Sequence, residues 1–158
     1  MLGKLDNEQI ESLLKHNIIG RLGFCENGKS YVLPISYAYD GKYIYCHSFE
    51  GRKLEVMRKF PQVCFQVDKM ANMANWESLL VWGKFEEIKD PEERKAALSI
   101  LLDRILPVIS SETVHLSPDW PFPPRDINKI EGIVFRIKVD EKSGRFEKAE
   151  SIYLAAFG

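Results

Sequence analysis

Apolar and polar residues alternate with a period of two along most of this chain, a pattern typical of strands that bury one face. Between residues 31 and 39, every odd position is aromatic or aliphatic. Five further segments alternate in a similar way. We therefore predict six strands, over residues 19–25, 31–39, 42–48, 62–68, 79–88 and 132–140.

Two-residue turns separate the first three of these strands. Asn27-Gly28 and Asp40-Gly41 are dipeptides that favour tight β-hairpin turns. The first three strands are therefore predicted to form an antiparallel meander. In the fifth strand, Gly83 indicates a bulge or a close approach of another backbone.

Three segments have helical spacing instead: residues 6–15, 50–59 and 90–105. Asp6 with Gln9, and Asp90 with Glu93, have the spacing of helix caps. The proline-rich residues 117–126 are predicted to form an irregular loop, and residues 145–158 show no pattern that we assign. The chain is thus predicted to be one α+β domain over residues 1–158, mainly β with helices, whose strands form a closed or nearly closed antiparallel barrel.

Composition and charge agree with a single globular domain. The chain has 158 residues, of which 45% are hydrophobic and 28% charged, as in ordinary globular proteins. The formal net charge is -1, so overall charge does not favour nucleic acid or an anionic membrane, and any anion site must be local. The sequence has no signal-peptide core and no apolar run of membrane-spanning length, so we expect a cytoplasmic protein.

The three cysteines, Cys25, Cys46 and Cys64, argue against a disulfide scaffold and a zinc ribbon. Their number is odd and no two have C-x-x-C spacing. A reducing compartment fits this usage. We expect all three to be small buried side chains, and we name no metal ligand and no catalytic residue.

The most chemically distinctive stretch is residues 45–53, where a predicted strand ends and a helix begins. His47 and Ser48 supply side-chain donors, and Arg52 and Lys53 place two cations in the first helical turn. Cations there oppose the helix dipole unless an anion compensates them. Free N–H groups at a helix start also favour an anion. These residues alone are equally compatible with a phosphate site and with a solvated Arg-Lys pair.

Several segments of the chain together resemble the flavin split-barrel superfamily, which includes pyridoxamine 5′-phosphate oxidase and the nitroimidazole-resistance flavoproteins. The strand at residues 31–37 resembles the one beside the flavin ring. Residues 44–48 followed by Gly51-Arg52-Lys53 resemble the phosphate motif for FMN. The other similar segments are residues 20–24, 61–68, 77–85 and 90–95. The His-Ser before Gly-Arg-Lys is most similar to the nitroimidazole-resistance subgroup. The last residues, 152–158, lack the Trp and Arg-rich ending of true pyridoxamine phosphate oxidases.

The resemblance implies a six-stranded split barrel that forms a homodimer with FMN at its interface. Arg52 and Lys53 would bind the phosphate, and residues 33–36 would line the flavin ring, largely through backbone groups. His47 and Ser48 would contact the phosphate or ribityl chain, or border the ring. The full set of implied cofactor contacts is Leu33, Pro34, Ile35, Ser36, His47, Ser48, Gly51, Arg52, Lys53, Trp76 and Ser78, the last two from the partner subunit.

The function implied is that of an FMN-dependent oxidoreductase. A nicotinamide cofactor would supply electrons, and a nitroaromatic, quinone or flavin would accept them. Two alternatives remain open at this point. One is a non-catalytic flavin or haem carrier on the same barrel, with His47 or His115 as a haem ligand. The other is a protein-interaction barrel without a cofactor.

Overall fold

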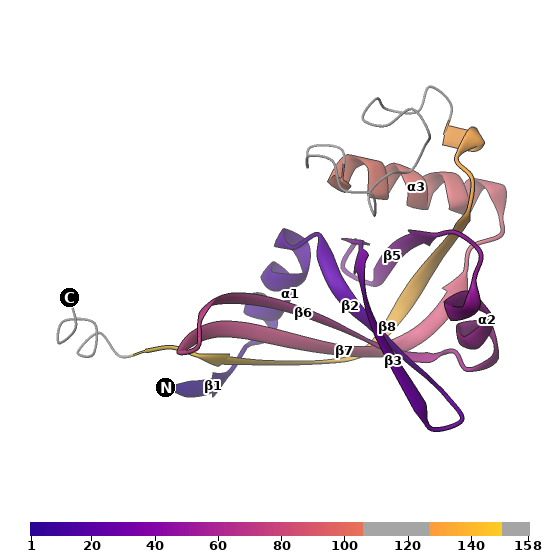
Figure 1. Ribbon diagram of the computed structural model, residues 1–158. Helices are drawn as coiled ribbons and strands as arrows, with labels where there is room; N and C mark the ends of the chain where they lie inside the picture. The colour runs from indigo at the N-terminus through magenta and orange to yellow at the C-terminus, as the bar shows by residue number, and fades with distance from the viewer. Residues whose placement is uncertain (106–126, 150–158) are drawn as a thin grey trace.

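The centre of the molecule is a strongly bent antiparallel sheet that three helices cover (Figure 1). The computed structural model describes residues 1–105 and 127–149. The strands are β1 (Leu2–Lys4), β2 (Ile19–Glu26), β3 (Lys29–Ser36), β4 (Ala38–Tyr39), β5 (Tyr43–Ser48), β6 (Gln62–Asn72), β7 (Asn75–Glu87) and β8 (Ile133–Glu147). The helices are α1 (Asn7–His16), α2 (Arg52–Lys59) and α3 (Pro91–Ile105), with a 3-10 turn, η2, at Ile127–Lys129.

The predicted α+β split barrel is confirmed, but the described residues contain eight strands and not six. The strand order is β3-β2-β6-β7-β8-β5-β4, and β1 also pairs with β8. One additional strand is β1, which is too short to show alternation. The other arises because the predicted strand at residues 31–39 divides into β3 and β4.

The predicted meander of the first three strands is wrong for the same reason. β3 pairs with β2, whereas β4 pairs with β5. Between them, the Tyr37 N–H donates to the Ile18 carbonyl at 2.9 Å. The chain changes its partner strand at this residue, so β3 and β5 approach each other without forming a ladder. This gap in the ladder is the split of the barrel.

The helices begin as their caps predict. Asp6 and Gln9 form a reciprocal capping box, with N···O distances of 2.8 and 2.9 Å. The Glu93 N–H donates to the Asp90 carboxylate at 3.0 Å at the start of α3. Helix α1 buries Ile10, Leu13 and Leu14 against the barrel. None of the helices in the described ranges is long and apolar enough to cross a membrane.

Three strands are longer than predicted, and their distal ends form a projecting arm (Figure 1). We define the arm as residues 69–77 and 144–149. Gly83 lies where β7 enters the barrel, and the register of β7 against β8 shifts between Trp82 and Gly83. A Cβ atom at Gly83 would lie 2.2 Å from the Lys138 carbonyl oxygen. The predicted bulge and close backbone approach are both confirmed.

The barrel interior is apolar and continuous with α1 and α2. Its largest fully buried side chains include Tyr37, Phe65 and Phe135. The Tyr37 hydroxyl donates to the Leu14 carbonyl at 2.7 Å, which ties the end of α1 to the split. Of the cysteines, Cys46 is buried as predicted, but Cys25 is exposed and Cys64 only half-buried, because both alternate onto the outer face of the sheet.

Candidate functional site

The junction of β5 with α2, residues 47–53, brings the predicted phosphate-binding residues together. Gly51 is the N-cap of α2 and has an extended backbone, and its position lacks a side-chain cap. The first intrahelical bond runs from the Glu55 N–H to the Gly51 carbonyl. The N–H groups of Arg52, Lys53 and Leu54 therefore have no acceptor within the helix. Free donors at a helix start suit an anion.

Lys53 is the most informative side chain of the junction. Among the lysines of residues 1–105 and 127–149, only Lys53 and Lys142 are not exposed. Lys142 forms an ion pair with Glu11, but Lys53 has no carboxylate partner in the described part of the chain. Burial lowers the pKa of the Lys53 ammonium. A partly buried cation without a counter-ion is unfavourable, so this position indicates an anionic ligand.

Arg52, the second predicted cation, has a protein partner. Its Nη2 lies 2.6 Å from Oε2 of Glu26, the last residue of β2, and the Arg52 side chain is 67% exposed. An exposed pair of this kind contributes only about 0–1 kcal/mol. The guanidinium can therefore exchange Glu26 for a stronger acceptor at little cost.

Glu50 lies within the junction but does not neutralise Lys53. Both of its carboxylate oxygens accept hydrogen bonds from Arg58, at 2.5 and 2.9 Å. Hydrogen bonds from Arg58 lower the pKa of Glu50. Arg58 also pairs with Glu87 at 2.5 Å. Glu50 is thus paired with Arg58, at the far end of α2, and not with Lys53.

His47 is neutral near pH 7 and has one ring nitrogen free to accept a hydrogen bond. Its Nε2 donates to the Glu131 carbonyl at 2.5 Å. Burial lowers the pKa of His47, and the charges of Arg94 and Lys53 lower it further, against the effect of the hydrogen bond to Glu131. The neutral ring with Nε2 protonated leaves Nδ1 as an acceptor. This state suits a hydroxyl or N–H donor better than a phosphate oxygen.

Ser48 completes the junction at the end of β5. It pairs with Ile133 of β8 and is half-buried. Its hydroxyl donates to the Phe49 carbonyl at 3.1 Å, a long hydrogen bond that a phosphate oxygen would replace readily.

The predicted ring-lining residues occupy an edge strand. β3 stands at one end of the strand order, so one of its backbone edges is unpaired. Leu33 and Ile35 pack on the barrel core, whereas Pro34 is exposed, as expected for proline on an edge. Ser36 is 7% exposed, and its hydroxyl has no hydrogen-bond partner among the described residues. Contacts from Leu33 and Ile35 to a ligand would have to come from the backbone.

Trp76 and Ser78 lie far from the junction within one chain. Glu87 of β7 contacts Arg58 of α2, and Trp76 is eleven residues earlier on the same extended strand. At a rise of about 3.3 Å per residue, a straight strand would place Trp76 about 36 Å, and Ser78 about 30 Å, from Glu87. In Figure 1, the β6–β7 turn and α2 lie at opposite ends of the sheet.

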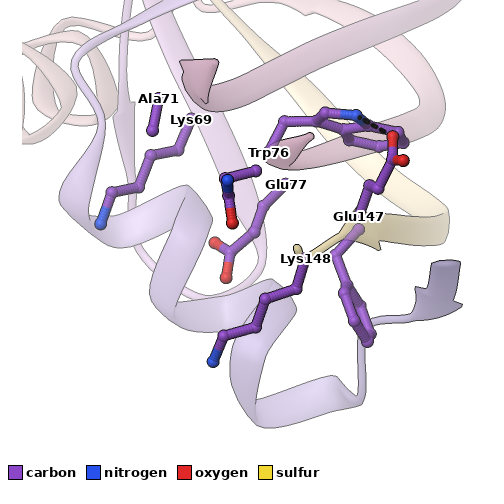
Figure 2. A pocket seen from close by; sticks show the side chains of 8 residues that line it. Lys69, Ala71, Trp76, Glu77, Glu147 and Lys148 are labelled. Atoms are coloured by element: carbon purple, nitrogen blue, oxygen red, sulfur yellow. Dashed lines mark hydrogen bonds between the residues drawn. The ribbon is translucent and has the colours of Figure 1, made fainter. Parts of the chain in front are cut away.

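The surroundings of Trp76 are a shallow pocket of about 220 Å³ on the arm (Figure 2). The Trp76 Nε1–H donates to Glu147 at 3.0 Å. Lys69, Glu77 and Lys148 also line the pocket, and Figure 2 shows their charged ends turned to the same side. The hydroxyl of Ser78 accepts a hydrogen bond from Gln66 at 3.0 Å. Both predicted side chains therefore already have protein partners.

A comparison with known proteins identifies the family. The family model described as pyridoxamine 5′-phosphate oxidase matches residues 6–146, from α1 to the end of β8. The chain belongs to this family. The resemblance to flavin split-barrel proteins is thereby confirmed.

Relatives of this member of the pyridoxamine 5′-phosphate oxidase family span nearly its whole length. An uncharacterized protein of Rhizobium meliloti is 28% identical over 152 residues, covering 89% of this chain and 92% of the relative. The crystal structure of an FAD-binding protein of Mesorhizobium loti is 28% identical with a TM-score of 0.69, covering 94% and 99% of the two chains. A candidate 5-nitroimidazole antibiotic resistance protein of Bacteroides thetaiotaomicron has the same fold, at 23% identity and a TM-score of 0.71, with coverage of 92% and 87%.

Three residues that support the site of this family member were not predicted from the sequence. Glu26 forms an ion pair with Arg52, and the Glu131 carbonyl accepts a hydrogen bond from His47. Gly132 has a φ of +96°, and a Cβ atom there would lie 2.7 Å from His47 Nε2. The glycine was visible as the start of the last predicted strand, but the contact between His47 and Glu131 beside it joins segments 84 residues apart.

For His47, the contact of Nε2 with the Glu131 carbonyl leaves Nδ1 free, as in many metal-ligating histidines, so this contact does not distinguish haem from flavin. His115, the other histidine considered as a haem ligand, lies outside the described residues.

Proposed function

We propose that this chain binds FMN, with the phosphate at the junction of β5 and α2. The main support for the proposal is that Lys53 is partly buried and has no counter-ion among the described residues. It lies beside the free N–H groups at the start of α2. A phosphate monoester carries between one and two negative charges near neutral pH and would compensate both features. Arg52 would then exchange Glu26 for the phosphate, and Ser48 would donate to it.

The flavin ring would lie along the split, between the free edge of β3 and the end of β5. Leu33, Pro34 and Ile35 would offer backbone groups there, and the Nδ1 acceptor of His47 suits a ligand that carries hydroxyl or N–H donors. A bound flavin supplies hydride and single-electron chemistry. The protein's part is to hold the phosphate and exclude water from the ring. FAD, which the Mesorhizobium loti relative binds, is the alternative form of the cofactor.

We further propose a homodimer in which Trp76 and Ser78 reach the cofactor of the partner subunit. Trp76 lies at the opposite end of β7 from Glu87, the residue that contacts α2, which favours a contact with the partner's junction over one with its own. The outer face of the sheet also exposes apolar surface for association. Val32 is 72% and Trp82 39% exposed, and both line a groove of about 310 Å³ with Cys25 and Cys64.

The activity proposed is reduction of a small organic acceptor, of the nitroaromatic, quinone or flavin class, with electrons from a nicotinamide cofactor. This part rests on the family alone, since the junction explains binding and not turnover. The compartment proposed is the cytoplasm, because all three cysteines are free thiols and free thiols persist in a reducing environment.

The test is the absorbance of the purified protein, with mass analysis of the released ligand, and the affinity of the Lys53→Met variant for FMN. A flavin spectrum with FMN as the released molecule is the expected result. Losing one charge-assisted hydrogen bond of about 1.5–3 kcal/mol should weaken FMN binding roughly 10- to 100-fold. Lys59→Met, an exposed position on the same helix, is the matched control. Unchanged FMN affinity in Lys53→Met would refute the phosphate site.

A further inference from the structure

We propose that Glu26 limits the affinity of the junction for a doubly charged phosphate, because its carboxylate competes with the ligand for Arg52 and repels the ligand's charge. This inference rests on the phosphate site proposed above. It adds a residue that makes binding at that site depend on the charge of the ligand. Glu26 is the last residue of β2 and lies outside the stretch of sequence that forms the junction.

The first reason is that Glu26 is the less exposed member of its ion pair. Its Oε2 lies 2.6 Å from Nη2 of Arg52, and the Glu26 side chain is 17% exposed, against 67% for Arg52. When the long arginine side chain turns to a ligand, a carboxylate with little access to water remains behind. A charge in such a place is unfavourable without a partner. Binding an anion through Arg52 therefore carries a cost that Glu26 sets.

The second reason is that Glu26 has a single cationic partner. Within residues 1–105 and 127–149, Arg52 is the one side chain that forms an ion pair with it. Lys29 is the register partner of Glu26 across the β2–β3 hairpin, but its Nζ lies over the Tyr31 ring, 5.4 Å from the centroid. The negative charge of Glu26 would therefore face the ligand once Arg52 turns away.

The third reason is that the backbone holds Glu26 beside the junction. Asn27 and Gly28, which follow it, have positive φ angles of 49° and 81°, as in a tight two-residue turn. Next to the turn, the rings of Phe24 and Tyr31 are stacked with their centroids 5.1 Å apart. The end of the hairpin is thus fixed on both strands, so the carboxylate stays near the junction when the arginine moves.

The charges at the junction indicate which ligands Glu26 disfavours. Arg52 and Lys53 contribute two positive charges, and Glu26 balances one of them before any ligand binds. Glu50 takes no part, because it pairs with Arg58. A phosphate monoester carries between one and two negative charges near neutral pH, and its second charge is repelled by the Glu26 carboxylate. A flavin without phosphate meets no such repulsion.

The experiment compares Glu26→Gln with the wild type in titrations with FMN and with riboflavin, the same flavin without its phosphate. Both titrations are followed by flavin fluorescence at about pH 8, where the monoester is a dianion. The dissociation constant for FMN should fall roughly 3- to 10-fold. The ion pair accounts for up to about 5-fold of this gain, and repulsion accounts for the rest. The dissociation constant for riboflavin should stay the same, which also shows that the variant is folded.

Two further variants separate competition for Arg52 from a general effect of charge. Glu8→Gln, at an exposed position of α1, makes the same change in net charge and should leave both dissociation constants unchanged. In the Arg52→Gln background, the gain from Glu26→Gln should shrink, because no guanidinium is left to compete for.

Three results would overturn the role of Glu26. One is an FMN dissociation constant of Glu26→Gln equal to or above that of the wild type. Another is an equal gain for riboflavin, which would show that Glu26 does not act on the phosphate. The third is a gain that is undiminished in the Arg52→Gln background. If the wild type binds FMN no more tightly than riboflavin, the phosphate site itself is refuted, so the two failures are distinguishable.

Discussion

The junction (residues 47–53) and the arm (residues 69–77 and 144–149) both gather charged side chains, but they balance those charges differently. In the arm, Lys69 and Lys148 are exposed, and the pocket that they line also contains Glu77 and Glu147. At the junction, Lys53 is partly buried and pairs with no carboxylate of the described residues. Solvated, mixed charges are ordinary surface, whereas a desolvated unpaired charge requires a partner.

The neutral polar groups of the two regions also differ. In the arm, Trp76 donates to Glu147, and Asn75 accepts from the Ala149 N–H at 3.1 Å. Near the junction, the hydroxyl of Ser36 has no partner within residues 1–105 and 127–149. Trp76 and Asn75 of the arm are therefore paired within the described residues, whereas the Ser36 hydroxyl near the junction is not. The proposed homodimer would give the arm its role at the partner's site.

Mixing two defective variants tests that division of roles and should give the largest effect. Arg52→Ala with Lys53→Ala removes the phosphate contacts and should weaken FMN binding at least roughly 100-fold. Trp76→Ala with Ser78→Ala removes the proposed partner contacts. Equimolar mixing with subunit exchange should restore FMN binding at about one quarter of the sites, since half of the dimers are mixed and each has one intact site. Bound FMN is measured after gel filtration.

The control for this mixing experiment is Met73→Ala, at an arm residue that is 92% exposed. It should bind FMN fully without any partner variant. Absence of restored binding in a mixture shown to contain mixed dimers would mean that both sets of residues act within one chain, which contradicts the assignment of Trp76 and Ser78 to the partner subunit.

Gly132 gives the next largest effect, on the stability of the junction. Its φ of +96° is a backbone conformation that residues with a Cβ atom rarely adopt. A Cβ atom there would also lie only 2.7 Å from His47 Nε2. Gly132→Ala should lower the free energy of unfolding by about 1–3 kcal/mol, as measured by urea denaturation.

Gly51→Ala is the matched control for stability at the same junction. Gly51 has an extended backbone, and a Cβ atom there meets nothing within 4 Å. Because Ala is a poorer N-cap than Gly, Gly51→Ala should cost roughly 0.5–1 kcal/mol, less than Gly132→Ala. Equal effects of the two substitutions would show that Gly132 does not hold His47 in place.

The fold could be predicted from the sequence where local pattern decides the structure. Alternation assigned the buried faces, and Gly83 marked the bulge because a close backbone approach excludes a side chain. Alternation does not identify the partner of a strand, so the switch at Tyr37 was missed. The arm was missed because its tip is exposed on both faces and residues such as Met70 and Asn72 are not patterned.

The site was predictable only as far as it is continuous in the sequence. His47, Ser48, Gly51, Arg52 and Lys53 fall in one short stretch, and the turn from strand to helix brings them together. Glu26 and Glu131 come from distant segments, and nothing local marks them as partners of Arg52 and His47. The unsatisfied state of Ser36 depends on every neighbour around it, which no sequence pattern records.

The smallest predicted effect concerns pH and His47. The unperturbed pKa of 6.5 is lowered in the folded protein, chiefly by burial. Below about pH 6.5 the unfolded chain therefore binds a proton that the native ring does not, and stability falls with falling pH by at most about 1.4 kcal/mol per pH unit. His47→Gln should remove this slope in urea denaturation, whereas His16→Gln, at an exposed position, should retain it.

FMN binding should preserve this pH dependence. A ligand that donates a hydrogen bond to Nδ1 of His47 holds the ring neutral and keeps its folded pKa below the unfolded value. The pH slope of the wild type should therefore persist when FMN is present, and FMN affinity should fall as pH falls through the same range, by linkage. A wild-type slope that flattens with saturating FMN would mean that the phosphate charge, and not a donor of the ligand, acts on His47, which contradicts the proposed contact at Nδ1.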